Sequence, residues 1–412
     1  MTRRVVVTGM GAVSPIGSDW PTVAAALESR RSAVRIVPDL SEIDGMDTRL
    51  GAPVTDFEAP ASWPRKRTRS MGRVSLLAAR ATEQALADAG LTDDPVLGGG
   101  RTGIAYGSTS GSPPAMAVYG DSIINARSLK GIRATDYIQL MSHTVPANLA
   151  QFFRVRGRIL STCSACTSGS QGIGFGYEQI QVGKQDVVIA GGAEEFHVID
   201  AAVFDIMYAT SKRNDAPETT PRPFDAARDG LVVGEGAATL VLEDLEHARR
   251  RGARIHAEVI GYGTNCDGVH ITNPDRAGMA SVIQLALEDA GLDVGAIDYV
   301  NAHGTATEAG DIAESHATLD TLGGRVPVSS LKSYVGHTLG ACGALEAWMT
   351  IEMMKQGSFA PTINLDEVDP SCAELDYIVG GMRKIDAEVA MSNNFAFGGI
   401  NTSLVFRRWP AT

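Results

Sequence analysis

Ala85-Leu86-Ala87-Asp88-Ala89-Gly90-Leu91 occurs a second time, with a single difference, as Ala286-Leu287-Glu288-Asp289-Ala290-Gly291-Leu292. Each copy is typical of the end of a helix, with Gly90 and Gly291 as the expected C-cap glycines. A match of this length at two distant places indicates that the chain contains one structural unit twice.

The segments on either side of the two copies also correspond. A strand-like run that ends in Gly-x-Gly precedes each copy, at residues 5–11 and 258–263. A short strand that opens into a glycine turn follows each copy, at residues 103–107 and 299–304. Strands that alternate with helices in this way predict largely parallel sheets covered by helices.

A third pair of matching segments leads to candidate catalytic residues. The run 158–161 leads to Cys166 and the run 326–329 leads to His337, and a helix rich in small residues is expected after each. In this alignment Cys166 and His337 occupy matching places. We expect the two helices to pack centrally, because interior glycines cost helix stability unless they permit a close approach.

These matches predict an α/β protein with two units related by an approximate twofold axis. The first unit, residues 1–253, carries the candidate nucleophile Cys166 and extra segments that we expect to cap the site or contact a second subunit. The second unit, residues 254–412, carries both candidate catalytic histidines. The chemistry is expected where the strand ends of the two units meet.

The composition excludes several classes of protein. The 412 residues are 44% hydrophobic and 20% charged, which is typical of a globular protein with an ample core. A net charge of −12 argues against nucleic-acid binding, because phosphate binding needs positive surface. The five cysteines do not suit a disulfide framework, and no apolar run suits a signal peptide or membrane span. We therefore predict a cytoplasmic protein without membrane insertion.

Two local motifs could indicate a metal or a nucleotide. Cys163-x-x-Cys166 has the spacing of a zinc half-site, but no second pair or nearby histidine completes it. Gly9-Met10-Gly11 follows a strand-like run, but Ser14 stands at the third glycine position and Pro15 disrupts the expected helix start. We therefore expect neither a metal nor a dinucleotide cofactor.

Cys166 lies in Ser164-Ala165-Cys166-Thr167-Ser168-Gly169, at the expected start of a helix. Backbone N–H groups and the helix dipole favour a thiolate at such a position. His303 and His337 each lie beside a glycine, which lets the backbone approach a substrate closely. A thiolate that carries an acyl group and two neutral imidazoles that stabilise a second anion suit acyl-transfer chemistry.

The chain resembles the β-ketoacyl-acyl-carrier-protein synthases, the elongating condensing enzymes of types I and II. The matching residues are Cys166, His303, Lys332, His337 and the tail Asn394-Phe395-Ala396-Phe397-Gly398-Gly399-Ile400-Asn401. The resemblance extends from Val5 to Phe406. It implies the thiolase fold, a duplicated five-layered αβαβα architecture, and a homodimer, with a heterodimer containing a chain-length-factor-like subunit as the alternative.

The resemblance implies a role for each matching residue. Cys166 is expected to take the acyl chain from an acyl carrier protein. His303 and His337 are expected to promote decarboxylation of malonyl carrier protein and to hold the enolate oxygen. Lys332 is expected to tune His303 and the nearby carboxylate of Glu314.

Further positions around the site are implied in the same way. The backbone N–H groups of Cys166 and Phe397 are expected to form an oxyanion hole, with Phe397 as a gate and Phe395 beside it. The other expected positions are Thr305 and Thr307 on the phosphopantetheine arm, Asp311 and Glu314 behind the catalytic residues, and Ser110 at the acyl pocket.

The expected partner is an acyl carrier protein, which brings the phosphopantetheine arm, so that no separate cofactor is required. Arg65-Lys66-Arg67-Thr68-Arg69 is a local basic cluster on an acidic chain. Carrier proteins are strongly acidic and the family docks them near this position, so Lys66 and Arg69 are the expected contacts.

The expected activity is that of an acyltransferase that extends acyl chains in fatty-acid biosynthesis by condensation with malonyl carrier protein. The alternative is a ketosynthase of a specialised polyene or polyketide pathway, because Glu308, Ala396 and Ile400 depart from the family pattern. A non-catalytic chain-length-factor subunit is less favoured, because such partners typically lack the nucleophile, which this chain keeps.

Overall fold

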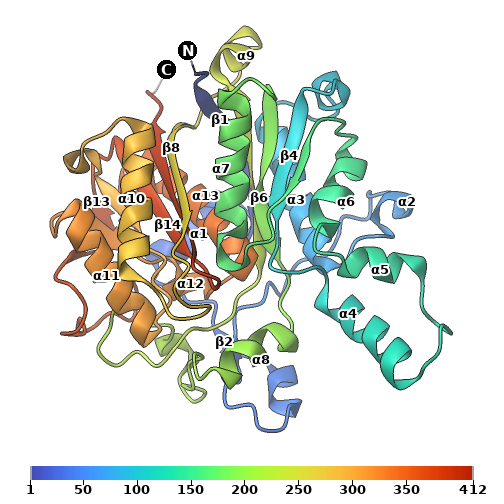
Figure 1. The fold of residues 1–412 in the computed structure, drawn as a ribbon, viewed down its shortest axis with the longest axis horizontal. Helices are drawn as coiled ribbons and strands as arrows, with labels where there is room; N and C mark the ends of the chain where they lie inside the picture. The colour runs from blue at the N-terminus through green and yellow to red at the C-terminus, as the bar shows by residue number, and fades with distance from the viewer. Residues whose placement is uncertain (1, 411–412) are drawn as a thin grey trace.

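The computed structural model describes residues 2–410, which form an eleven-stranded mixed sheet surrounded by helices (Figure 1). One half of the sheet has the order β5 (Ile159–Ser161), β4 (Thr102–Gly107), β6 (Val187–Glu194), β7 (Gly236–Asp244), β1 (Val5–Val13). The other half has the order β10 (Pro327–Ser329), β9 (Tyr299–Asn301), β14 (Val389–Phe395), β15 (Ile400–Arg408), β8 (Ala257–Cys266), with β12 (Asp376–Tyr377) outside β10.

The two halves of the sheet have the same pairing pattern. In the first half β5, β4 and β6 are parallel, whereas β6, β7 and β1 are antiparallel. In the second half β10, β9 and β14 are parallel, whereas β14, β15 and β8 are antiparallel. Antiparallel pairing of β1 with β8 joins the halves edge to edge. This repeated order confirms the predicted duplication, while the exact division at residues 253 and 254 stays a prediction.

The expectation of largely parallel sheets is wrong for the inner strands. β1, β7, β8 and β15 all pair in antiparallel fashion with their neighbours. The turn at residues 396–399 that joins β14 to β15 is far too short for the crossover of about a dozen residues that a parallel pair requires. Only the outer strands, where helices connect the strands, keep the parallel arrangement.

Helices lie in three layers around the two halves of the sheet. The central layer consists of α7 (Ser168–Gln181) and α13 (Cys342–Gln356), which contact each other and strands of both halves. Outside the first half lie α3 (Arg73–Asp88) and α6 (Thr144–Phe153), and outside the second lie α10 (Arg276–Ala290) and α11 (Glu308–Leu322) (Figure 1). This arrangement gives the predicted αβαβα layers.

Small residues allow the close packing of the two central helices. A Cβ atom on Gly169 of α7 would lie 2.8 Å from the backbone nitrogen of Ala344 in α13. A Cβ atom on Gly343 of α13 would lie 2.7 Å from the backbone nitrogen of Ser170. Since real Cβ atoms do not approach this closely, glycine is required, and the predicted central packing of these helices is confirmed.

The remaining α-helices are shorter. They are α1 (Trp20–Glu28), α2 (Arg65–Thr68), α4 (Pro113–Gly120), α5 (Ala134–Leu140), α8 (Val198–Ile206), α9 (Leu245–Arg250) and α12 (Lys332–Val335). The remaining strands form two small sheets, β2 (Arg35–Ile36) with β3 (Leu50–Gly51) and β11 (Ser358–Phe359) with β13 (Arg383–Lys384). Within residues 2–410 every helix falls short of the length and apolar character needed to cross a bilayer.

Candidate active site

Two equivalent turns lead into the central helices. Cys166 lies in a single 3₁₀ turn between β5 and α7, and the residue before it, Ala165, has φ of +49°. The turn before α13 has the same form, with Leu339 at φ of +47° followed by Gly340. The residue that matches Cys166 is therefore Gly340, and the expected match with His337 is wrong by three residues.

The three candidate catalytic residues meet at the ends of the strands of both halves. The sulfur of Cys166 lies 3.0 Å from Nε2 of His337. The rings of His303 and His337 are perpendicular, with centroids 5.2 Å apart. The sulfur and one nitrogen of each imidazole all lie within 4.8 Å of one another, and all three side chains are buried. One small substrate group can thus contact all three.

Hydrogen bonds fix the orientation and tautomer of both imidazoles. Nδ1 of His337 accepts the backbone N–H of Leu339 at 3.3 Å, and Nδ1 of His303 accepts from the Lys332 ammonium at 3.1 Å. Because each Nδ1 is an acceptor, each Nε2 carries the proton. The two Nε2–H groups are donors toward the site.

Both imidazoles are neutral over the physiological range. Burial lowers the pKa of His303 well below its usual value, and the charge of Lys332 and the neighbouring His337 lower it further. Burial and Lys332 likewise lower the pKa of His337. Neutral N–H donors, arranged before substrate arrives, are suited to stabilising an enolate oxygen without giving up a proton to it.

Burial opposes the resting thiolate that was expected at Cys166, and that thiolate stays a prediction. Burial raises the pKa of the Cys166 thiol to about 12, which outweighs the opposing effects of Lys332 and of the backbone groups of Phe397 and Cys166. The sulfur is buried, and loss of hydration disfavours the charged thiolate. The two backbone groups that contact the sulfur are the pair expected to form the oxyanion hole.

Lys332 has a different carboxylate partner from the one expected. Its ammonium forms a short ion pair with Glu346 of α13, and both side chains are buried. The other carboxylate oxygen of Glu346 accepts from the Asn394 side chain at 2.7 Å. Burial lowers the pKa of Lys332, but the combined attraction of Glu346, Cys342 and Glu314 raises it overall, so that the ammonium stays charged beside His303.

Glu346 was not expected from the sequence, although a signal for it exists. It is the one charged residue in the run from Leu339 to Ile351, where every side chain is buried. A carboxylate in such a helix needs a buried cation, and Lys332, already singled out by its place before His337, is a candidate.

Glu314 and Asp311 of α11 both accept backbone N–H groups, and Asp311 also lies 3.7 Å from the guanidinium of Arg228. Glu314 accepts the backbone N–H groups of His303 and Gly304, both at 2.7 Å. Asp311 accepts the backbone N–H groups of Thr305 and Ala306 at 3.0 and 3.1 Å. Burial raises the pKa of Glu314 to about 8 and that of Asp311 to about 6. Both carboxyls therefore shape the loop that presents His303.

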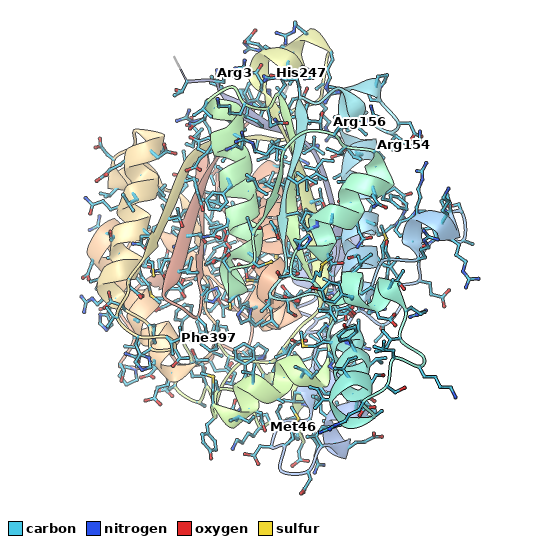
Figure 2. The ribbon with its side chains drawn as sticks, turned by 45° about the vertical axis from the view of Figure 1, so that its right-hand side comes forward. Arg3, Met46, Arg154, Arg156, His247 and Phe397 are labelled. Atoms are coloured by element: carbon cyan, nitrogen blue, oxygen red, sulfur yellow. The ribbon has the colours of Figure 1, made fainter. Side chains whose placement is uncertain are left out.

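A cavity of about 270 Å³ opens onto the catalytic trio. Thr305 and Thr307 line it, with their hydroxyl oxygens 2.9 Å apart. Phe395 packs against His303 with ring centroids 5.9 Å apart, and Phe397 packs against Phe204 at 5.4 Å. In Figure 2 Phe397 lies at the end of the molecule that carries α8.

The remaining expected residues lie outside this cavity. Ser110 is half-buried in the turn after β4, and its hydroxyl donates to the Gly111 carbonyl at 3.2 Å. Its place in an acyl pocket stays a prediction. Lys66 and Arg69 line a separate open hollow of about 450 Å³ together with Arg133.

Comparison with known proteins agrees with this geometry. The family model described as beta-ketoacyl synthase, N-terminal domain, matches residues 2–248, and the model of the C-terminal domain matches residues 256–366. The 3-oxoacyl-[acyl-carrier-protein] synthase 1 of Haemophilus influenzae is 38% identical over 409 residues, which are 99% of each chain.

Solved structures agree over the whole chain. A beta-ketoacyl synthase from Burkholderia phymatum is 60% identical with a TM-score of 0.98, and the match covers 99% of this chain and 100% of that one. The ishigamide ketosynthase/chain length factor is 35% identical with a TM-score of 0.92 over 100% of both chains. The type II polyketide ketosynthase solved with its acyl carrier protein, AntDE:AntF, is 28% identical with a TM-score of 0.88 over 100% of both chains. The fold is therefore the predicted thiolase fold, and the chain belongs to the β-ketoacyl synthase family.

Proposed function

We propose that the chain condenses an acyl thioester with malonyl carrier protein, with loss of CO₂, to give a β-ketoacyl carrier protein. The observation that carries this proposal is the meeting of one thiol and two neutral Nε2–H donors within 4.8 Å. The Haemophilus relative carries the name of this activity. Incubating the purified chain with acyl and malonyl carrier proteins tests it, and the β-ketoacyl product and released CO₂ are the expected result.

In the first step the acyl chain moves to Cys166. A bond forms between the Cys166 sulfur and the acyl carbonyl carbon, and the bond from that carbon to the carrier sulfur breaks. The proton that leaves Cys166 ends on the departing carrier thiol. The backbone N–H groups of Cys166 and Phe397 stabilise the oxyanion that forms at the carbonyl oxygen.

In the second step the malonyl group loses CO₂ and attacks the acyl enzyme. The bond between its carboxylate and α-carbon breaks, and the electron pair forms an enolate whose oxygen accepts from Nε2–H of His303 and His337. The α-carbon then bonds to the acyl carbonyl carbon as the bond to Cys166 breaks. The thiolate released on Cys166 takes a proton from solvent, which completes the cycle.

His303→Ala and His337→Ala are each expected to lower decarboxylation by about 10²-fold, because each removes one enolate donor. Acyl transfer to Cys166 is expected to fall by less than about tenfold, since that oxyanion uses backbone donors. The two steps are followed separately, as CO₂ released and as the mass of the acylated chain. His316→Ala, a half-buried histidine of α11 whose ring contacts the Ser371 carbonyl at 3.1 Å, is the control. Equal losses in both steps would contradict the assigned roles.

The carrier protein delivers its substrate as a thioester on the phosphopantetheine arm, and we propose that Thr305 and Thr307 hold this arm in the cavity. The paired hydroxyl groups at the cavity wall can bind the amide groups of the arm. No further cofactor is required, because the thioester is already an electrophile and decarboxylation itself generates the carbanion.

The double variant Lys66→Glu/Arg69→Glu is expected to raise the KM for acyl carrier protein about tenfold with kcat unchanged, because surface charges mainly govern association. The difference from the parent chain should shrink at high salt. Acyl-pantetheine, which has no acidic protein surface, should react equally with both chains. Arg249→Glu/Arg250→Glu on α9 reverses two exposed charges in the same way and is the charge-matched control. An unchanged KM for carrier protein would place its docking site elsewhere.

We propose that a second subunit covers the segment that contains α4 and α5. This segment exposes several large apolar side chains, which are Met116, Val118, Ile124, Leu129 and Tyr137. A second copy of the chain is the simplest partner, whereas the ishigamide structure is titled as a ketosynthase with a chain length factor. Light scattering of the purified chain should give twice the mass of one chain, and a monomer would favour the heterodimer.

The chain is about as similar to the Haemophilus 3-oxoacyl-[acyl-carrier-protein] synthase 1 as to the ishigamide ketosynthase. Two classes of product are therefore considered, saturated fatty acyl chains and conjugated polyene chains. Primary fatty-acid elongation is our main proposal. A panel of saturated and polyunsaturated acyl carrier proteins distinguishes the classes, because a preference for conjugated chains would assign the specialised pathway.

A further inference from the structure

One buried carboxylate that the proposed mechanism does not use holds two turns beside the catalytic trio. Glu194 is the last residue of β6, and its side chain is completely buried. Its Oε2 atom accepts the backbone N–H of Thr109 at 2.8 Å and the backbone N–H of Gly340 at 3.0 Å. These two amides belong to different halves of the duplicated fold.

The contact between Glu194 and Gly340 is linked to His337 through Leu339. Gly340 follows Leu339, which has the left-handed φ of +47° that bulky residues rarely adopt. The N–H of Leu339 donates to Nδ1 of His337, and this bond places the proton on Nε2. By holding Gly340, the Glu194 carboxylate fixes the next peptide of a turn whose conformation would otherwise be unfavourable.

The position of Gly340 leaves no room for the turn to relax toward Glu194. A Cβ atom on Gly340 would lie 2.6 Å from the Thr109 nitrogen and 2.8 Å from Oε2 of Glu194. The equivalent position in the first half carries Cys166. The first turn thus presents the nucleophile Cys166. The matching turn has a glycine at this position, which leaves room for the Glu194 carboxylate to bind the backbone.

The contact between Glu194 and Thr109 is linked to the start of α7 through Ser108. The hydroxyl of Ser108 donates to the Ser110 carbonyl, and the Ser108 carbonyl accepts from Ser168 at the start of α7 at 3.4 Å. The same carboxylate oxygen therefore ties the His337 turn to the turn after β4 and, through it, to the helix that follows Cys166.

We propose that Glu194 is a positioning residue, which holds the Leu339–Gly340 turn so that His337 presents Nε2–H to the enolate oxygen. The inference rests on the proposed function where it is tested by the rate of decarboxylation. It does not rest on that function where it is tested by the tautomer of His337. The position of the acceptor oxygen, rather than its charge, is what the turn requires.

The surroundings of Glu194 agree with a role as acceptor. Burial, and then the nearby Asp200, raise the pKa of Glu194 to about 8, so the carboxyl is largely neutral at pH 7. Among residues 2–410 nothing hydrogen-bonds to Oε1, so Oε2 alone makes the contacts with the two turns. A glutamine, with one carbonyl oxygen and no charge, should therefore replace Glu194 well.

The test compares Glu194→Gln, which keeps an acceptor, with Glu194→Met, which has similar length and none. In Glu194→Met we expect decarboxylation to fall at least about tenfold, with the KM for malonyl carrier protein within about twofold of the parent. In Glu194→Gln we expect both values within about threefold of the parent. Glu195→Gln is the matched control, because that buried carboxylate binds Ser112 and Val74 instead of these turns.

Nitrogen-15 NMR of His337 supplies a readout that does not depend on the proposed activity. The parent chain and Glu194→Gln should show the Nε2–H tautomer, and Glu194→Met should show a mixture of tautomers. A folded Glu194→Met chain with the parent tautomer and decarboxylation within about twofold would overturn the inference, as would a large loss in Glu194→Gln. A parent chain that fails to condense, with the expected tautomers intact, would count against the proposed function alone.

Gly340→Ala provides a second route if Glu194→Met does not fold. The added methyl group would lie 2.8 Å from Oε2 of Glu194 and should displace it from the turn. The expected result is the same mixture of His337 tautomers and the same selective loss of decarboxylation. A Gly340→Ala chain with the parent tautomer and parent rates would overturn the inference. If this chain also fails to fold, the test is Glu194→Gln, in which a large loss of decarboxylation would overturn the inference.

Discussion

The Cys166→Ala variant is expected to lose condensation by about 10³-fold or more, because no other side chain in the site can carry the acyl group. Cys342, the other buried thiol nearby, donates its S–H to the Cys166 carbonyl at 3.1 Å and is thereby turned toward the backbone. Burial raises the pKa of both thiols, so the orientation of the Cys342 S–H group, rather than its pKa, is what separates it from Cys166. Formation of the β-ketoacyl carrier protein is the measurement.

Mass spectrometry of the chain after incubation with acyl carrier protein makes this prediction specific. The parent chain should gain one acyl group on Cys166, and Cys166→Ala should gain none. Cys163→Ala, which removes an exposed thiol three residues upstream, should behave as the parent does. Condensation that survives Cys166→Ala would remove the basis of the proposed mechanism, and a parent chain that never becomes acylated would favour a non-catalytic subunit.

The sequence allowed the architecture to be predicted because the duplication leaves local marks. Gly90 and Gly291 both adopt positive φ after equivalent helices, and this conformation is what glycine permits at low cost. No comparable residue pattern in the sequence indicates the direction of the strands. Whether β7 and β15 run parallel or antiparallel to their neighbours depends on the path of the chain between elements, which local patterns do not encode.

The sequence was enough to predict the reacting groups of the site. It was not enough to predict the burial and the charged neighbours of these groups. Cys166, His303 and His337 lie in short glycine-containing segments whose composition is visible in the sequence. The resting state of the thiol depends on burial by both halves, which no local pattern reports. The partner of Lys332 was missed for a related reason, since Glu346 of α13 approaches Lys332 of α12 only in the folded chain.

Replacing Glu346 by glutamine is expected to lower the free energy of unfolding by about 3 kcal/mol, because it leaves the buried ammonium of Lys332 without its counter-ion. Glutamine keeps an acceptor for the Asn394 amide, which donates to Glu346 at 2.7 Å, so the loss reports the charge rather than that hydrogen bond. Activity should fall with stability, since an unpaired Lys332 gives up its proton or moves away from Nδ1 of His303.

The double variant Lys332→Met/Glu346→Gln separates the two consequences. Removing both charges should restore most of the stability, because a buried ion pair adds little over uncharged side chains of similar size. Decarboxylation should stay at least about 10²-fold below the parent, since Nδ1 of His303 then lacks the donor that keeps the proton on Nε2. Thermal unfolding and CO₂ release measure the two effects. A double variant that recovers activity together with stability would show that Lys332 only compensates Glu346 and that His303 needs no cation beside it.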